Sequence, residues 1–156
     1  MSAWESAEER ARALIGLWER RSLGVVRAED AAEFARAAGE SDLRLIDPGR
    51  ADFVVHPMYA VSLLRAAPGA APAEFRPDGM YRDEVPGTDG LDVRLMAGGQ
   101  HVRWLGEVRV GDRIDMRRAV TAVERKSTGF LLLTVEKAYG TEEGTLVEVT
   151  ERFIVR

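Results

Sequence analysis

Two histidines are the imidazoles that this sequence offers for acid–base chemistry. His56 precedes Pro57 at the start of an apolar segment, and Tyr59 follows it by one helical turn. An imidazole and a phenol at this spacing can share a cavity, where they would donate a hydrogen bond to a substrate oxygen or move a proton. The alternative is structural: His56 binds the backbone at a helix start, and Tyr59 is a core residue with its hydroxyl at the edge.

Other catalytic and cofactor chemistries find little support in the residue pattern. His56 and His101 lie 45 positions apart, which is not a zinc-ligand spacing, and the chain has no cysteine for a thiolate ligand or a disulfide. Gly98-Gly99 lacks the lysine and hydroxyl residue of a phosphate-binding loop. A Ser/His/Asp triad stays open, although there is no Gly-x-Ser-x-Gly elbow. We therefore expect no metal ion and no cofactor.

Length and charge narrow the class of protein further. The 156 residues are enough for one domain, and 46% apolar with 31% charged residues is typical of a globular chain. Acidic residues (26) exceed basic ones (22), which argues against nucleic acid or an anionic membrane as a partner. The chain shows neither a signal-peptide core nor an apolar run that would span a bilayer, so the expected location is the cytoplasm.

The first half of the chain is predicted to be mainly helical. Ser2 and Glu5 have the spacing of a capping box, and the apolar period predicts a helix over residues 3–20. A short strand over 22–27, a helix over about 29–38 and a loop over 40–52 are expected next. Residues 57–64 are nearly all apolar, which predicts a buried helix. Residues 68–90 predict a long irregular stretch of the kind that forms a lid or a binding loop.

The second half is predicted to consist of strands. Val102 and Trp104 alternate with His101 and Arg103, and three long strands are expected over 113–124, 130–139 and 146–156. Turns are expected at 127–129 and 140–144. Arg117 and Arg118 interrupt the alternation and suggest a bulge, and most arginines of these strands are expected to be solvated. One buried helix against a curled antiparallel sheet is an α+β architecture.

Several stretches form a longer pattern. Residues 98–104 read Gly-Gly-Gln-His-Val-Arg-Trp, residues 108–112 read Val-Arg-Val-Gly-Asp, and residues 55–58 read Val-His-Pro-Met after an acidic helix over 27–39. In this order they resemble the MaoC-like acyl dehydratases, most closely their N-terminal FAS1-like domain. The resemblance covers about residues 10–156 and implies a single hotdog domain over 1–156, with a central helix wrapped by the sheet. It also implies acyl thioesters of coenzyme A (CoA) or acyl carrier protein (ACP) as substrates.

The catalytic loop of that family, Gly-Asp-x-Asn-Pro-x-His-x-Asp, aligns with residues 39–47, and the sequence departs from it. Glu40 replaces the aspartate, Asp42 the asparagine and Leu45 the histidine. An aspartate and a histidine are needed there to position and deprotonate water, and leucine cannot act as a base. Residues 105–107, Leu-Gly-Glu, also replace a His-Arg-Pro triplet. Standard hydration would therefore need other residues.

The expected site combines these family positions with the chemistry of the side chains. His56 and Tyr59 would polarise the thioester, and Glu40 or Asp42 would handle the proton, unless the two acids are merely solvated. The catalytic candidates are His56, Tyr59, Glu40 and Asp42, and the substrate-binding candidates are Gln100, Gly99, Trp104 and Met58. His101 is expected on the opposite face from Gln100, in solvent or at a subunit interface.

Three functions stay open at this point. The first is a hydratase or dehydratase that acts with non-standard residues on 2-enoyl, 3-hydroxyacyl or polyketide thioesters. The second is a non-catalytic acyl-binding subunit of a heterodimeric dehydratase, and the third is a hotdog thioesterase that uses Glu40 or Asp42. An exposed sheet edge predicts a dimer, either a homodimer or a heterodimer with a catalytic hotdog subunit.

Overall fold

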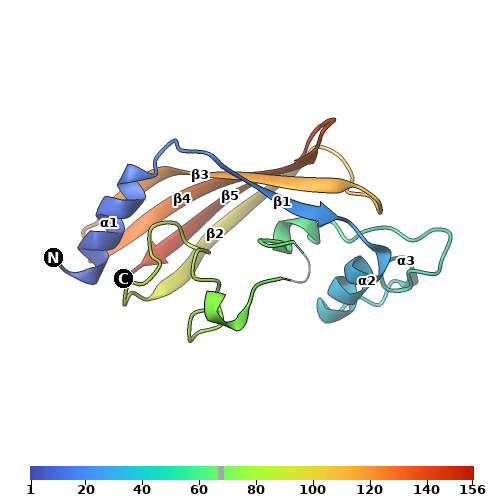
Figure 1. The fold of residues 1–156 in the computed structure, drawn as a ribbon, viewed down its shortest axis with the longest axis horizontal. Helices are drawn as coiled ribbons and strands as arrows, with labels where there is room; N and C mark the ends of the chain where they lie inside the picture. Colours follow the sequence, from blue (N-terminus) through green and yellow to red (C-terminus); the bar gives the residue numbers. More distant parts are fainter. Residues whose placement is uncertain (67–68) are drawn as a thin grey trace.

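The computed structural model describes residues 1–66 and 69–156, which form one antiparallel sheet with short helices towards its two ends (Figure 1). The helices are α1 (Ala3–Ala13), α2 (Ala28–Ala37) and α3 (Leu43–Ile46), with 3-10 turns η1 (Ala60–Ser62) and η2 (Pro72–Glu74). The strands are β1 (Glu19–Val25), β2 (Leu95–Trp104), β3 (Arg113–Lys126), β4 (Phe130–Thr141) and β5 (Gly144–Val155). Their order in the sheet is β1-β3-β4-β5-β2, so β1 and β2 are its edges.

The N-terminal helix is shorter than its apolar period predicts. The Ser2 capping box is confirmed, but α1 ends at Ala13, and the expected helix to residue 20 is wrong. Gly16 adopts a left-handed backbone with φ of 78°, which turns the chain out of the helix. Residues from Glu19 onward then pair with β3, so the strand expected over 22–27 begins and ends earlier.

The three long C-terminal strands and the turns between them are confirmed, as is the helix expected over 29–38. The bulge is misplaced in the sequence prediction. The β3–β4 register shifts between Val120 and Ala122, whereas Arg117 and Arg118 keep the regular alternation. Arg118 points into the core instead of into solvent, because it finds charged partners there. The irregular stretch is confirmed over 69–90 apart from η2, and Pro68 lies outside the described residues.

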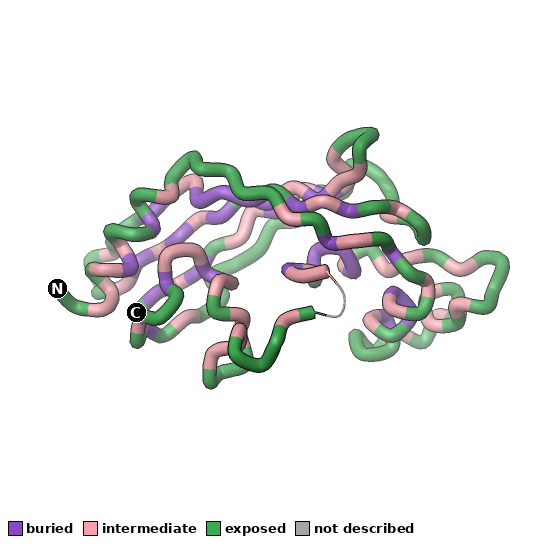
Figure 2. The backbone as a smooth tube through the Cα atoms, viewed as in Figure 1, coloured by how far each residue is buried: buried purple, intermediate pink, exposed green. Residues whose placement is uncertain are grey.

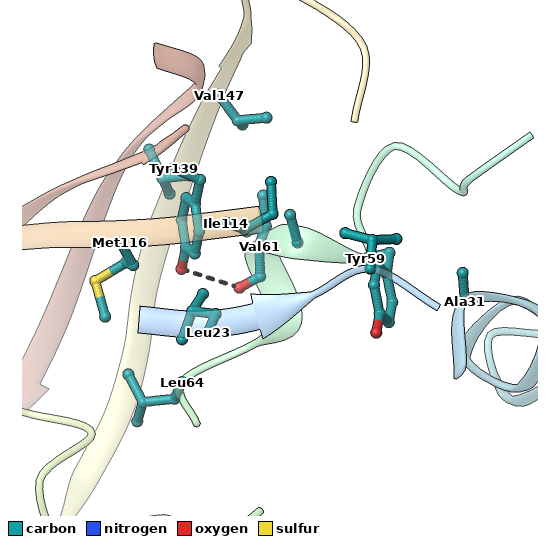
Figure 3. Close-up of a cluster of buried hydrophobic side chains, with 12 residues drawn as sticks. Leu23, Ala31, Tyr59, Val61, Leu64, Ile114, Met116, Tyr139 and Val147 are labelled. Atoms are coloured by element: carbon teal, nitrogen blue, oxygen red, sulfur yellow. Dashed lines mark hydrogen bonds between the residues drawn. The ribbon is translucent and has the colours of Figure 1, made fainter. Parts of the chain in front are cut away.

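The buried helix expected over 57–64 is a single 3-10 turn, η1. Its burial is confirmed, since Tyr59, Ala60, Val61 and Leu64 are all buried. The Ser62 hydroxyl donates to the carbonyl of Tyr59, which competes with continued helical bonding. The Tyr139 hydroxyl of β4 donates to the carbonyl of Val61 at 3.3 Å (Figure 3). This carbonyl therefore accepts a hydrogen bond from the sheet and not from a following helical turn.

The core is divided into two apolar clusters. One packs η1 and α2 against β1, β3, β4 and β5, and the other packs α1 and residues 85–95 against the opposite ends of the strands. Buried residues accordingly lie along the central strands and at the segments facing them (Figure 2). Arg118 and Lys137, both buried, share the core face with these clusters.

Replacing Tyr139 by Phe is expected to lower the free energy of unfolding by about 1 kcal/mol, because the carbonyl of Val61 loses its buried donor. Chemical denaturation measures this difference. Tyr81→Phe, at a half-buried tyrosine that stacks on Phe75, is the matched control and should change stability less. Equal stability of wild type and Tyr139→Phe would contradict the role of this hydrogen bond.

The segment before β2 is fastened to the sheet through Asp83. Its carboxylate pairs with Arg21 at 2.8 Å and Arg65 at 2.7 Å, and Arg118 donates to its backbone carbonyl at 2.8 Å. Burial alone would raise the pKa of Asp83, but the hydrogen bond from Arg65 and the charges of Arg21 and Arg118 hold it below its usual value. Asp83 therefore stabilises the fold in its ionised form.

Asp83→Asn is expected to be less stable than wild type near neutral pH. A lowered folded-state pKa contributes stability above the unfolded-state pKa, and this contribution is lost as the pH falls through the folded-state value. The difference in unfolding free energy should thus narrow below about pH 4. Asp89→Asn, at an exposed position of the same segment, is the control. A difference that does not vary with pH would contradict this assignment.

Candidate functional site

A groove of about 790 Å³ lies between the loop after α2 and the end of β2. Four parts of the chain line it: residues 42, 44 and 45, residues 53–55 and 57, Trp104 with the loop 106–110, and Val147 of β5. The neighbouring His56 is not part of the lining. Most of the wall is apolar, and the apolar residues are Leu45, Phe53, Val54, Val55, Pro57, Trp104, Val108, Val110 and Val147. Asp42, Arg44, Glu107 and Arg109 supply its charges. Such a cleft suits an apolar chain that carries a charged head group.

Trp104 connects two walls of this groove. Its indole Nε1 donates to the carbonyl of Pro57 at 3.2 Å, which holds the end of β2 against the 53–57 segment. The residue as a whole remains 51% exposed, so an incoming apolar group can still pack on it. Among the four predicted substrate-binding residues, Trp104 lines the groove and Met58, Gly99 and Gln100 do not. Met58 instead packs against the first core cluster.

The structure brings His56 and Glu40 together. The Nδ1 atom of His56 accepts the backbone N–H of Met58 at 3.0 Å, so a neutral imidazole carries its proton on Nε2. Nε2 lies 3.1 Å from Glu40 Oε1 and donates to it. The edge of the Phe34 ring packs against the imidazole at 5.4 Å between ring centres. Both ring nitrogens are thus bonded to the protein, and the pair fastens the end of α2 to the segment that forms the groove wall.

Asp42 lines the groove, but its carboxylate is already bound. It caps α3 by accepting the N–H of Arg44 at 2.9 Å, and it accepts the guanidinium of the same residue at 2.7 Å. The side-chain hydrogen bond from Arg44 is the larger cause, and the backbone bond the smaller, of a pKa below the usual aspartate value. An acid held ionised in this way is a weaker base than a free one.

Tyr59 lies in the core and does not line the groove. Burial, with a smaller contribution from the charge of Asp30, raises the pKa of its phenol. Its ring contacts Phe34 edge-on at 5.8 Å between ring centres. His101 sits on the exposed face of β2, opposite to Val102, which packs on the first cluster. Catalytic roles for His56, Tyr59, Glu40 and Asp42 stay predictions.

Sequence reasoning missed much of the groove wall. Phe53 and Val54 lie between the loop expected over 40–52 and the buried helix expected from residue 57, and Val147 is an ordinary strand residue. The run Phe-Val-Val at 53–55 was the available signal, because three consecutive apolar residues are unusual in a solvated loop and indicate that the segment packs against something. Leu45, which stands at the position of the family histidine, does line the groove.

The sequence matches the family described as "FAS1-like, dehydratase domain region" over residues 13–150. The chain belongs to this family. No curated protein matches it by sequence. The resemblance seen in the glycine-rich and Val-Arg-Val-Gly-Asp stretches is therefore confirmed, and the groove of this FAS1-like dehydratase domain lies between those stretches and the loop where the related catalytic motif would stand.

Solved structures establish the hotdog fold of this FAS1-like domain. A MaoC-like dehydratase from Phytophthora capsici superimposes with a TM-score of 0.72 at 18% identity, over 94% of this chain and 50% of that one. The HadBC (3R-hydroxyacyl-ACP dehydratase) complex of Mycobacterium tuberculosis gives 0.62 at 17% identity, over 90% and 96%. An (R)-hydratase from A. caviae gives 0.57 at 20% identity, over 89% and 94%. The chain thus spans about half the length of the Phytophthora protein.

Within residues 1–66 and 69–156, no group of three or more histidine, cysteine, aspartate or glutamate side chains could hold a metal ion. In the same part of the chain, no helix combines the length and the apolar character needed to cross a membrane.

His56→Ala is expected to lower the free energy of unfolding by about 1–3 kcal/mol, because the N–H of Met58 and the carboxylate of Glu40 lose a partly buried partner. His101→Ala removes the same side chain from an exposed position and should change stability by less than about 0.5 kcal/mol. Thermal and urea unfolding of both variants measure the difference. If the two variants are equally stable, the hydrogen bonds of His56 do not stabilise the fold.

Proposed function

We propose that this domain binds acyl thioesters in the groove and acts as the acyl-binding subunit of a hydratase or dehydratase. Membership in the FAS1-like dehydratase family supports the reaction class, and the apolar groove supports an acyl chain as the ligand. The reaction is addition of water to a 2-enoyl thioester, or its loss from a 3-hydroxyacyl thioester.

The observation that carries this proposal is that the acid–base side chains in and beside the groove are either replaced or already hydrogen-bonded to the protein. Leu45 lines the groove where the family motif has a histidine. The nearby alternatives are committed to other bonds, since Asp42 binds Arg44 and His56 binds both Glu40 and the Met58 N–H. A general base needs a free lone pair within reach of water. We therefore assign the proton transfer to a second hotdog subunit that carries the intact aspartate and histidine.

The charges of the groove suit the carrier of the acyl chain. Arg109 is largely exposed, and Arg44 retains 59% of its side-chain exposure despite its bond to Asp42. Guanidinium groups at such a site can meet the phosphates of CoA or of the phosphopantetheine arm of an acyl carrier protein. The acyl chain would then pack on Val54, Trp104 and Val110.

The edge strand β2 supports pairing with a second subunit. Nearly all of its ten residues are exposed, including Met96 and Trp104, and no strand within the described chain pairs with its outer edge. Unpaired edges of this length are normally covered in proteins. The HadBC complex and the ChsH1-ChsH2 complex, both among the similar structures, are named as two-protein assemblies. A heterodimer fits the proposal, and a homodimer is the other arrangement of the same edge.

One observation favours a catalytic alternative. The His56–Glu40 pair has the distance of an imidazole oriented by a carboxylate, as in activated catalytic dyads. For His56 to act as a base towards water, its Nδ1 would have to release the Met58 N–H. The chain would then be a hydratase on its own, with His56 and Glu40 as its acid–base pair.

Calorimetry with purified protein and CoA thioesters of 2-enoyl and 3-hydroxyacyl chains tests the binding. Wild type is expected to bind, and Val54→Glu, which places a carboxylate in the apolar wall, should weaken binding about tenfold or more. Met96→Glu, at an exposed residue at the other end of β2, is the matched control and should bind as wild type does.

Mass spectrometry of the same mixtures tests for turnover. We expect neither addition of water nor release of free thiol by the chain alone. Gain of one water would move the function to an autonomous hydratase, and loss of this activity in His56→Ala would identify the base. Release of free thiol would identify a thioesterase. Absence of binding to every thioester would overturn the proposal itself.

A further inference from the structure

A row of polar side chains crosses the core face of the sheet, strand by strand. Glu19 of β1 lies opposite Arg118 of β3, and Arg118 lies opposite Lys137 of β4. Lys137 Nζ pairs with Oε2 of Glu151 on β5 at 2.5 Å, and Glu151 lies opposite Gln100 of β2. The side chains on either side of this row belong to the two apolar clusters, so the row separates them.

Stability alone is a weak reason for such a row. Lys137 is only 4% exposed, and a buried ion pair recovers little more than the cost of removing its charges from water. Apolar residues of similar volume would join the two clusters into one core. We therefore consider a role for this row in ligand recognition as well as in folding.

The row reaches the surface at its β2 end. Gln100 is exposed, and its Nε2 donates to Glu151 Oε1 at 2.8 Å. This bond leaves the Gln100 carbonyl oxygen and its second amide hydrogen to face a ligand. The charge of Lys137 favours this orientation of the carboxylate, because its Nζ lies at ion-pair distance from the other oxygen, Oε2, although the two atoms are not aligned for a hydrogen bond.

The same face of β2 leads from Gln100 to the groove. Gln100, Val102 and Trp104 alternate onto this face, opposite Glu151, Val149 and Val147 of β5. Trp104 and Val147 line the groove. Trp104 lies four positions along the strand from Gln100, a distance of about 13 Å. A chain that starts at the groove and follows β2 would meet the amide after passing an apolar stretch.

We propose that Gln100, oriented by Glu151 and Lys137, is a specificity-determining residue that recognises an oxygen group near the far end of the acyl chain. This inference rests on the proposed function. A hydroxyl at this position exchanges a hydrogen bond with the Gln100 amide, which a methyl end cannot do. Because Gln100 is exposed, the preference for the hydroxyl is that of one hydrogen bond.

The test compares lauroyl-CoA with its ω-hydroxy analogue, both below their micelle concentrations, by calorimetry. Wild type is expected to bind the ω-hydroxy chain about two- to tenfold more tightly than the alkyl chain. Gln100→Met, a change at an exposed position that preserves the side-chain length, should abolish this ratio. Arg103→Met is the matched control, since Arg103 pairs with Glu148 across the same two strands on the opposite face. It should keep the ratio.

A second variant separates orientation from contact. Lys137→Met combined with Glu151→Met removes the buried pair as a unit, which avoids an unpaired buried charge. This double variant keeps Gln100 but removes the carboxylate that orients its amide, so the ratio of the two binding affinities should fall towards one. Equal binding of both chains by wild type, or an unchanged ratio in Gln100→Met, overturns this inference alone. Binding of neither chain by wild type overturns the proposed function and this inference with it.

Discussion

The guanidinium of Arg118 joins three segments that lie far apart in the sequence. From β3 it binds the carboxylate of Glu19 on β1 and the backbone carbonyls of Asp83 and Glu84. Arg118 is only 3% exposed, so water cannot replace these partners, and losing one would leave a buried charge poorly compensated. Arg118 thus supports the position of the edge strand β1 in addition to its ladder with β3, and the path of the segment before β2 in addition to the pairs of Asp83 with Arg21 and Arg65. That path decides how much of the core face the chain covers by itself.

At the other end of the sheet, the short η1 turn likewise determines the path of the chain across the core face. Tyr139 holds the carbonyl of Val61, and the chain leaves the sheet after a single turn. The groove lies between the segment that enters this turn and the end of β2, and the outer edge of β2 has no strand beside it within the described chain. The groove and that unpaired edge meet at Trp104. A second subunit paired with β2 would therefore lie next to any acyl chain that follows the same strand.

Sequence patterns predicted those elements whose conformation depends on residues nearby in the sequence. The capping box, α2, the three long strands and their turns follow from caps, alternation and glycines within a few residues. Burial of residues 59–64 was predictable from their apolar character, but the length of the helix was not, since an apolar run is equally compatible with one 3-10 turn. The polar row was missed because Arg118, Lys137 and Glu151 each look like solvated strand charges. Their partners come from other strands, and only the register brings them together.

The candidate site shows the same division between what neighbours along the chain reveal and what only the fold brings together. Family position placed Asp42, Leu45 and Trp104, and all three line the groove. It also selected Glu40 and His56, but the sequence could not reveal that the N–H of Met58 occupies the imidazole. A wall that must keep its shape benefits from closed pairs such as His56 with Glu40 and Asp42 with Arg44. A proton shuttle needs the opposite, a lone pair left open at the reacting atom. The bonds that hold this part of the chain in shape thus also occupy lone pairs of Asp42 and His56 that a proton transfer would use.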